Sequence, residues 1–373
     1  MMGNCIRKGL PASNMKLFNK KKQFVAVDIG TSSIKLMELD CRGAKPYLLN
    51  ASITPLPINA FSNNQITKKE SVAEKLRTAL ASQQGGETNI VTAMPALAVF
   101  TKRISMAAMD PREIATTIRF EAGNYIPQGV DTVKLDYSIL DHKANEEIDV
   151  LVVAVKNEIV DSFVECFTLA GYDTGIVDVD YFALQNAYEL SYPELREKSV
   201  CLVHIGARYS FINICKNGVP LFTGNIAVGG TAITQEIAKV MSVEVTDAET
   251  LKLESTEEAS SPDDKVASTI AKSRRGIVSD LDRQIRIMWN ASGADEDISH
   301  IFLSGGGALL QGLSKELSDA IGCSCQLLDP FRGFEVGDEF DKEYLAKLSP
   351  SMSIAAGLAI RSFGDKEEGG LAA

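Results

Sequence analysis

The sequence predicts an α/β protein made of two similar halves that face each other across a phosphate-binding cleft. Two observations behind this prediction are a glycine-centred turn between apolar strands at 24–39 and the same arrangement at 200–215. The third is the glycine cluster Gly305–Gly307, which follows a short apolar run. Glycine lets a turn approach a phosphate closely and present its N–H groups. Two such hairpins facing each other would hold a triphosphate from both sides.

The first half is predicted to begin with strands and one helix. Apolar and alternating runs indicate strands at 24–29, 34–39, 47–54 and 90–94. Thr67–Glu70 has the composition of a capping box, which marks a helix start. The apolar spacing of Val72, Leu76 and Leu80 continues that helix.

Residues 96–170 have a different pattern of strand and helix signals, which predicts a compact α+β insert. Asp110, Pro111 and Glu113 mark a helix start, because Pro fits the first helical position and an acid suits the first turn. The expected order is strand, helix, strand, strand, helix, over 97–106, 110–124, 133–140, 148–155 and 157–170.

The chain then returns to a strand at 176–179 and a helix through Ala187, followed by a linker at 193–198. The second half opens with the repeated hairpin. The remaining elements are predicted as helices at 231–240, 268–289, 309–321 and 353–362, with a strand at 298–303.

Composition and charge exclude several function classes. The 373 residues carry a net charge of −11 with a pI of about 5.0, which argues against binding that depends on neutralising nucleic-acid phosphates. The seven cysteines are scattered, and several lie in apolar runs, which favours free thiols in a reducing compartment over a zinc site. No apolar run approaches the roughly 20 residues of a membrane span. A cytoplasmic protein is therefore expected.

The order of the glycine motifs resembles the actin-like ATPase fold, a duplicated ribonuclease H-like α/β fold with two lobes around a nucleotide cleft. Asp28–Ser33 resembles its first phosphate motif, His204–Tyr209 its second and Ser304–Ala308 its adenosine motif.

Within that superfamily the chain most resembles the PilM family of cytoplasmic type IV pilus assembly proteins, over roughly residues 23–363. The more specific segments are Asp28–Glu38, Gly305–Leu313 and Ala355–Arg361. The insert lies where PilM and FtsA proteins carry a subdomain that actin lacks.

The resemblance implies a domain organisation. The first lobe comprises 23–95 and 171–195, the inserted subdomain 96–170, and the second lobe 196–363, with 241–297 as its outer subdomain. The polar, basic residues 1–22 are expected to form a disordered leader, or to precede the true start codon, with a membrane-touching arm as the alternative. Residues 364–373 form a polar tail.

The resemblance also implies ATP and Mg²⁺ as ligands. The expected nucleotide-binding residues are Asp28, Gly30, Thr31, Ser32, Ser33, Lys35, Gly206, Ala207, Arg208, Gly229, Gly230, Gly305, Gly306, Gly307 and Leu309. Asp28 is the best catalytic candidate and would hold Mg²⁺ through water. Lys35 either reaches a phosphate or only solvates a strand. The three glycines are expected to open a helix whose N-terminus favours polar or anionic ligands.

His204 is a departure from the family pattern, because the second phosphate motif usually begins with an acid. Neutral imidazole cannot supply the negative charge with which paired acids hold a hydrated magnesium ion. We therefore expect nucleotide binding with weak or absent ATP hydrolysis. The alternatives for His204 are a core histidine that fills a strand end and a general base.

The resemblance implies an ATP-binding adaptor of type IV pilus assembly. It would act at the inner face of the cytoplasmic membrane and dock the N-terminal cytoplasmic segment of a PilN-like inner-membrane protein, using the first half of the chain. Other pilus assembly proteins are further expected partners, and membrane association is expected only through partners.

Two alternatives remain open. The first is an FtsA-like division filament protein, although the tail at 364–373 lacks the apolar face of a membrane helix. The second is a small-molecule kinase of the same fold, which would need a general base at the second hairpin, where His204 and Arg208 stand.

Overall fold

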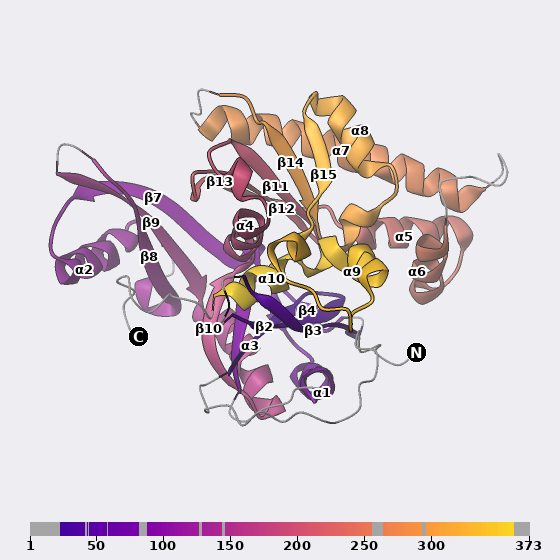
Figure 1. Ribbon diagram of the computed structural model, residues 1–373, viewed down its shortest axis with the longest axis horizontal. Coiled ribbons are helices and arrows are strands. Elements are labelled where there is room, and N and C mark those ends of the chain that lie inside the picture. Colours follow the sequence, from indigo (N-terminus) through magenta and orange to yellow (C-terminus); the bar gives the residue numbers. More distant parts are fainter. Residues whose placement is uncertain are drawn as a thin grey trace.

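Figure 1 presents the computed structural model of the chain. The structure describes residues 23–361 except 42, 44, 58, 82–87, 127–128, 144–145, 256–263 and 293–295. The predicted leader and the polar tail therefore lie outside the described residues. No helix in the described ranges combines the length and the apolar character needed to cross a membrane.

The first lobe contains a five-stranded mixed sheet. Its strands, in spatial order, are β10 (Asp173–Val179), β6 (Thr88–Met94), β1 (Gln23–Ile29), β2 (Ser33–Asp40) and β3 (Tyr47–Pro55). The first three strands of the chain form an antiparallel meander, and β6 and β10 lie parallel to β1. Helices α1 (Lys69–Leu80) and α3 (Asn157–Ala170) pack together and share a buried core with this sheet. Between β3 and α1 lies a small hairpin formed by β4 (Phe61–Ser62) and β5 (Gln65–Ile66).

The second lobe repeats this topology. Its sheet has the order β13 (Val219–Ile226), β12 (Ser210–Lys216), β11 (Val200–Ile205), β14 (His300–Ser304) and β15 (Ser324–Leu327). Three antiparallel strands are again followed by two parallel ones. The duplication predicted from the two hairpins is therefore a duplication of the whole sheet. The helices of this lobe are α5 (Gly230–Met241), α6 (Val245–Glu254), α7 (Lys265–Ser292), α8 (Leu313–Ile321) and α9 (Lys342–Leu348).

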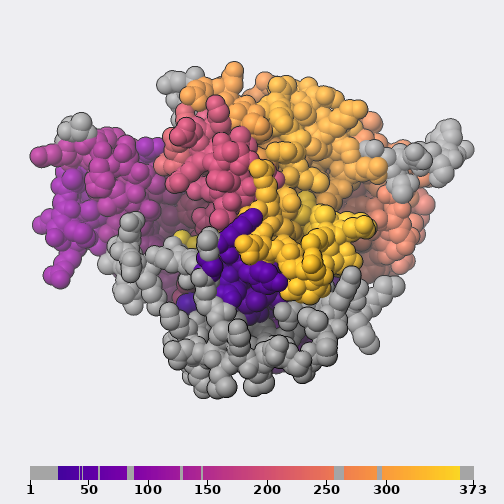
Figure 2. Space-filling model, in the orientation of Figure 1, coloured from indigo at the N-terminus to yellow at the C-terminus, as the bar shows by residue number. Residues whose placement is uncertain are grey.

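The insert forms a separate sheet that projects from one side of the molecule (Figures 1 and 2). Its antiparallel strands are β7 (Val99–Ala107), β9 (Glu147–Lys156) and β8 (Val133–His142), and α2 (Pro111–Ala122) packs on one face through Ile114 and Ile118. The predicted start of α2 is confirmed, because Asp110 and Glu113 form a reciprocal capping box before Pro111. The capping box predicted at Thr67 is wrong: α1 begins at Lys69 without a side-chain cap, and the Thr67 hydroxyl instead donates to the Ala60 carbonyl.

Two helices pack against a different part of the molecule from the one that the predicted domain boundaries give them. Helix α3 lies within the predicted insert, yet its Phe163 and Phe167 are buried with the first-lobe sheet. Helix α10 (Ser353–Ile360) lies within the predicted second lobe, yet it packs on β1 and α4 (Asp180–Ser191). In both cases the apolar side chains of the helix are buried against the first lobe.

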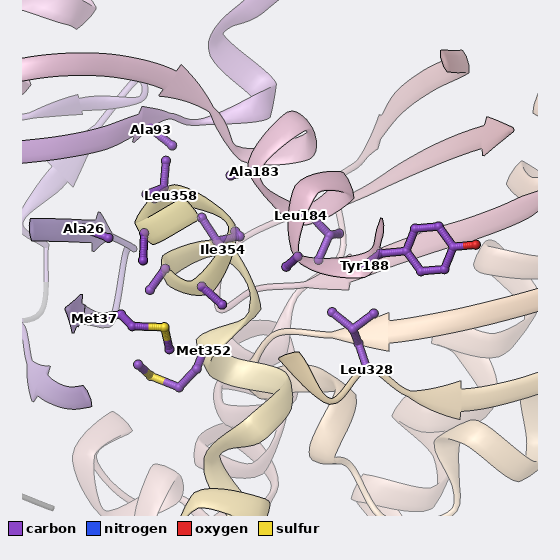
Figure 3. Close-up of a cluster of buried hydrophobic side chains, with 14 of the residues drawn as sticks. Ala26, Met37, Ala93, Ala183, Leu184, Tyr188, Leu328, Met352, Ile354 and Leu358 are labelled. Carbon is purple, nitrogen blue, oxygen red and sulfur yellow. The ribbon is translucent and has the colours of Figure 1, made fainter. Parts of the chain in front are cut away.

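The α4–α10 contact forms the centre of the largest core, which joins the two lobes (Figure 3). Ile354 and Leu358 of α10 lie between Ala26 and Met37 of the first sheet and the helix α4. A Cβ at Gly357 would lie 1.6 Å from the Ala183 carbonyl oxygen. The helices can cross this closely only because that position has no side chain.

Candidate nucleotide-binding site

The two predicted hairpins have the same turn geometry. The Gly30 N–H donates to the Ser33 carbonyl at 3.0 Å, and the Gly206 N–H donates to the Tyr209 carbonyl at 3.0 Å. The strand register then places Asp28 opposite Lys35 in the first hairpin and His204 opposite Phe211 in the second. The first hairpin thus presents a charged pair where the second presents an aromatic pair.

Asp28 and Lys35 form an ion pair inside the first hairpin. The Lys35 Nζ lies 3.2 Å from the Asp28 Oδ2, and the two side chains are only 13% and 7% exposed. A Cβ at Gly30 would lie 2.7 Å from this Nζ, so the glycine leaves room for the ammonium group. Lys35 therefore does not solvate the strand surface; its charge is held beside Asp28 and the Gly30 turn.

His204 is buried in the second hairpin. Its Nδ1 lies 3.1 Å from the Ser304 hydroxyl, and its ring stacks on Phe211 with centroids 4.9 Å apart. Burial, assisted by the Lys35 charge, lowers the pKa of His204 to about 3, so the imidazole is neutral at physiological pH. The alternative in which it is a core histidine at a strand end agrees with this environment.

Asp180, at the start of α4, is a site residue that sequence reasoning missed. Its Oδ2 accepts hydrogen bonds from the Ala96 N–H at 3.3 Å and from the Tyr209 hydroxyl at 3.2 Å. Burial, followed by the charge of Asp28, raises the pKa of Asp180 to about 8. Two carboxyl groups from distant segments therefore lie within electrostatic reach of each other. Its position in the sequence could have identified it, because Asp180, like Asp28, lies where an apolar strand of the first lobe ends.

The turn at Gly229–Gly230 packs directly against the second hairpin. The Gly230 N–H donates to the Gly206 carbonyl at 3.0 Å, and the Thr231 N–H donates to the Ala207 carbonyl at 2.8 Å. A Cβ at Gly229 would lie 2.5 Å from that Ala207 oxygen. Both glycines thus lie beside the second hairpin, and the Gly230 and Thr231 N–H groups are bonded to its backbone.

The glycine cluster after β14 also packs on the second hairpin. Gly305 has φ +83°, and a Cβ there would lie 2.4 Å from the Ile205 carbonyl oxygen. Residues Gly306–Leu309 form a short 3₁₀ turn, and the exposed Leu309 ends it. The prediction that a helix begins at this cluster is wrong, because α8 begins only at Leu313, after the left-handed Gly312.

The space between the hairpins is small in this structure. A cavity of about 100 Å³ is lined by Thr31, Phe61, Asn64, Pro95, Leu97, Arg208, Tyr209 and Ala227. Pockets for drug-sized ligands typically hold about 300 Å³ or more. Arg208 also crosses between the lobes, where its guanidinium donates to the Phe61 carbonyl at 3.4 Å. The cavity in this structure is therefore smaller than a pocket for a drug-sized ligand.

The acidic residues of the first hairpin and α4 do not fit a metal ion bound directly by side chains. In the described part of the chain, no group of three or more His, Cys, Asp or Glu side chains is placed to hold a metal. Asp28 is paired with Lys35, and Asp180 accepts two hydrogen bonds. Magnesium prefers octahedral oxygen ligands that include carboxylates, and neither carboxyl group is unengaged here.

The duplicated sheets, the paired hairpins and the glycine turn define a protein of the actin-like ATPase fold, as predicted. Similar folds include the ethanolamine utilization protein EutJ from Carboxydothermus hydrogenoformans, with TM-score 0.57, 14% identity, and coverage of 96% of this chain and 93% of that one. Another is a non-polymerisable pCBH ParM mutant, with TM-score 0.50, 13% identity, and coverage of 92% and 99%.

Within that fold, the chain belongs to the family of the type IV pilus assembly protein PilM, whose sequence model matches residues 26–363. A solved PilM–PilN type IV pilus biogenesis complex has a similar structure. Its TM-score is 0.81 at 24% identity, and the match covers 92% of this chain and 99% of that one. The match confirms the predicted family and favours it over the division-protein alternative.

Proposed function

We propose that this chain is a cytoplasmic ATP-binding adaptor of type IV pilus assembly. The observation that carries the proposal is the PilM family match, which spans both lobes and the insert. The adaptor would act at the inner face of the cytoplasmic membrane by docking the N-terminal cytoplasmic segment of a PilN-like inner-membrane protein. Membrane association would come through that partner, and other pilus proteins would assemble on the same platform.

The nucleotide would bind between the two hairpins. Turn N–H groups and the Lys35 ammonium supply donors on the first-lobe side, and Arg208 supplies a guanidinium on the other. Gly306, where a Cβ would have only the Ser351 hydroxyl within 4 Å, would leave the backbone open to the nucleoside. The sequence expectation of a water-mediated Mg²⁺ at Asp28 stays a prediction, as does weak or absent hydrolysis.

A thermal-shift titration tests the nucleotide site. A ligand that binds only the folded chain stabilises it by about 2.7 kcal/mol at 100 times its Kd. ATP should raise the melting temperature of the wild type and of the control Asp173→Ala, whose side chain is exposed. Asp28→Ala, which leaves the Lys35 ammonium without its carboxylate partner, should change the size of this ligand-induced increase. If ATP shifts neither the wild type nor the control, the site assignment fails.

The partner peptide would dock on the first half of the chain, near the insert. This subdomain holds no part of the hairpins, yet it exposes the large apolar side chains Phe100, Phe120, Tyr125 and Ile139. Strands β7 and β8 are the edges of its sheet. An extended segment can add to such an edge through backbone hydrogen bonds and bury its apolar side chains.

Calorimetric titration with a PilN N-terminal peptide, followed by hydrogen exchange, tests this docking. Binding at micromolar concentration with protection confined to residues 23–190 is expected. A footprint confined to 200–361, or no binding, would refute the docking proposal and favour the division-protein alternative. Turnover of small phosphate acceptors in a parallel assay would instead favour a kinase.

A further inference from the structure

The two hairpins together lack the free pair of acids of a paired-acid nucleotide site. In the second hairpin, His204 stands where an acid is usual, and it is committed to Ser304 and Phe211. In the first hairpin, the equivalent Asp28 carboxylate is already neutralised by Lys35 at 3.2 Å. The site therefore carries an ammonium group beside the one carboxylate that would meet a hydrated metal ion.

The position of Lys35 makes its charge available to more than one group. It lies opposite Asp28 in the strand register and within electrostatic reach of both Asp180 and His204. An ammonium group has three donors, so it can bind a phosphate oxygen while it keeps Asp28 as a partner.

The other carboxyl group of the site does not compensate for the missing acid. Asp180 receives the Ala96 N–H and the Tyr209 hydroxyl, and both contacts hold its Oδ2 against the protein. A directly bound metal ion would have to displace Lys35 from Asp28 or these donors from Asp180. Because Mg²⁺ sheds its water shell reluctantly, it would be held here mainly by negative charge, and Lys35 already balances the charge of Asp28.

We propose that this chain binds nucleoside triphosphate without requiring a divalent cation, and that the Lys35 ammonium supplies the positive charge that Mg²⁺ supplies in paired-acid sites. The inference rests on the proposed nucleotide binding and specifies how that site meets the phosphate charge. It also accounts for two features that occur together. The second acid, which would help to hold a metal ion, is missing, and Lys35 provides a cation beside the first turn.

The test is calorimetric titration of ATP into the full chain in EDTA and, separately, in excess MgCl₂. The two Kd values should differ by less than about tenfold, which corresponds to 1.4 kcal/mol. Binding that disappears in EDTA and returns with Mg²⁺ would overturn the inference while supporting the nucleotide site. Absence of binding in both buffers would overturn the proposed nucleotide site itself.

Two variants sharpen the result. Lys35→Met keeps the length of the side chain and removes its charge, so binding in EDTA should weaken by more than about tenfold. Its freed Asp28 should make the remaining binding depend on Mg²⁺. The control Lys216→Met removes a lysine that is paired with Glu296 at the end of β12 and should bind like the wild type in both buffers. If Lys35→Met binds in EDTA as well as the control does, Lys35 is not the cation.

Discussion

The buried carboxyl of Asp180 predicts a specific pH dependence of stability. Burial and the neighbouring Asp28 raise its pKa from the ordinary value of 3.8 to about 8. A group whose pKa is raised in the folded state contributes its full stability at pH values below its unfolded pKa. That contribution is lost as the pH rises through the folded pKa, because the unfolded chain releases the proton more easily.

The expected size of this effect follows from the shift. As the pH rises from about 4 to about 8, this group should lower the free energy of unfolding by on the order of 1 kcal/mol per pH unit. Asp180→Asn keeps an oxygen that can accept from the Ala96 N–H and the Tyr209 hydroxyl, but it cannot ionise. Its stability should therefore fall less steeply than that of the wild type over this interval.

Urea denaturation at pH 5, 6, 7 and 8, without nucleotide or metal, measures the difference. The control is Asp173→Asn, an exposed aspartate at the start of β10, which should follow the wild type. The stability advantage of Asp180→Asn over the wild type should grow by about 1 kcal/mol or more per pH unit. Parallel curves for all three proteins would refute the assignment of Asp180 as a buried neutral acid.

Three further predictions concern glycine packing and hydrolysis. Gly357→Ala should destabilise the chain by about 3 kcal/mol or more, because its Cβ would overlap the Ala183 carbonyl, and a urea midpoint equal to that of the wild type would contradict the α4–α10 packing. The matched Gly276→Ala on α7, where nothing lies within 4 Å of the new Cβ, should instead stabilise by about 0.5–1 kcal/mol in the same assay. ATP hydrolysis by the wild type should be slow, since loss of a well-placed catalytic group commonly costs about 10² to 10⁴ in rate, and His204→Asp should raise turnover or leave it unchanged. A brisk wild-type rate that collapses in His204→Asp would show that the histidine is catalytic.

Local signals in the sequence were sufficient where one turn or one helix end decides the structure. The two hairpin turns, the Pro-initiated helix α2 and the left-handed Gly171 that ends α3 depend on backbone geometry within a few residues. The prediction from composition failed at Thr67, because its hydroxyl donates to the Ala60 carbonyl instead of capping the helix. It also misled at Gly305–Gly307, where backbone turns replaced the expected helix start.

The sequence by itself determined the duplicated hairpins, the insert and the departure at His204, because each can be recognised from patterns among residues that are close together in the sequence. Only the tertiary structure decided which distant groups meet. Asp180 reaches Asp28 and Tyr209 because α4 follows a strand of the first sheet, and Lys35 turns toward Asp28 because Gly30 leaves space for it. The packing of α3 and α10 in the first lobe was decided in the same way. Burial of apolar faces fixes these long-range contacts, and that burial depends on the whole fold rather than on neighbouring residues.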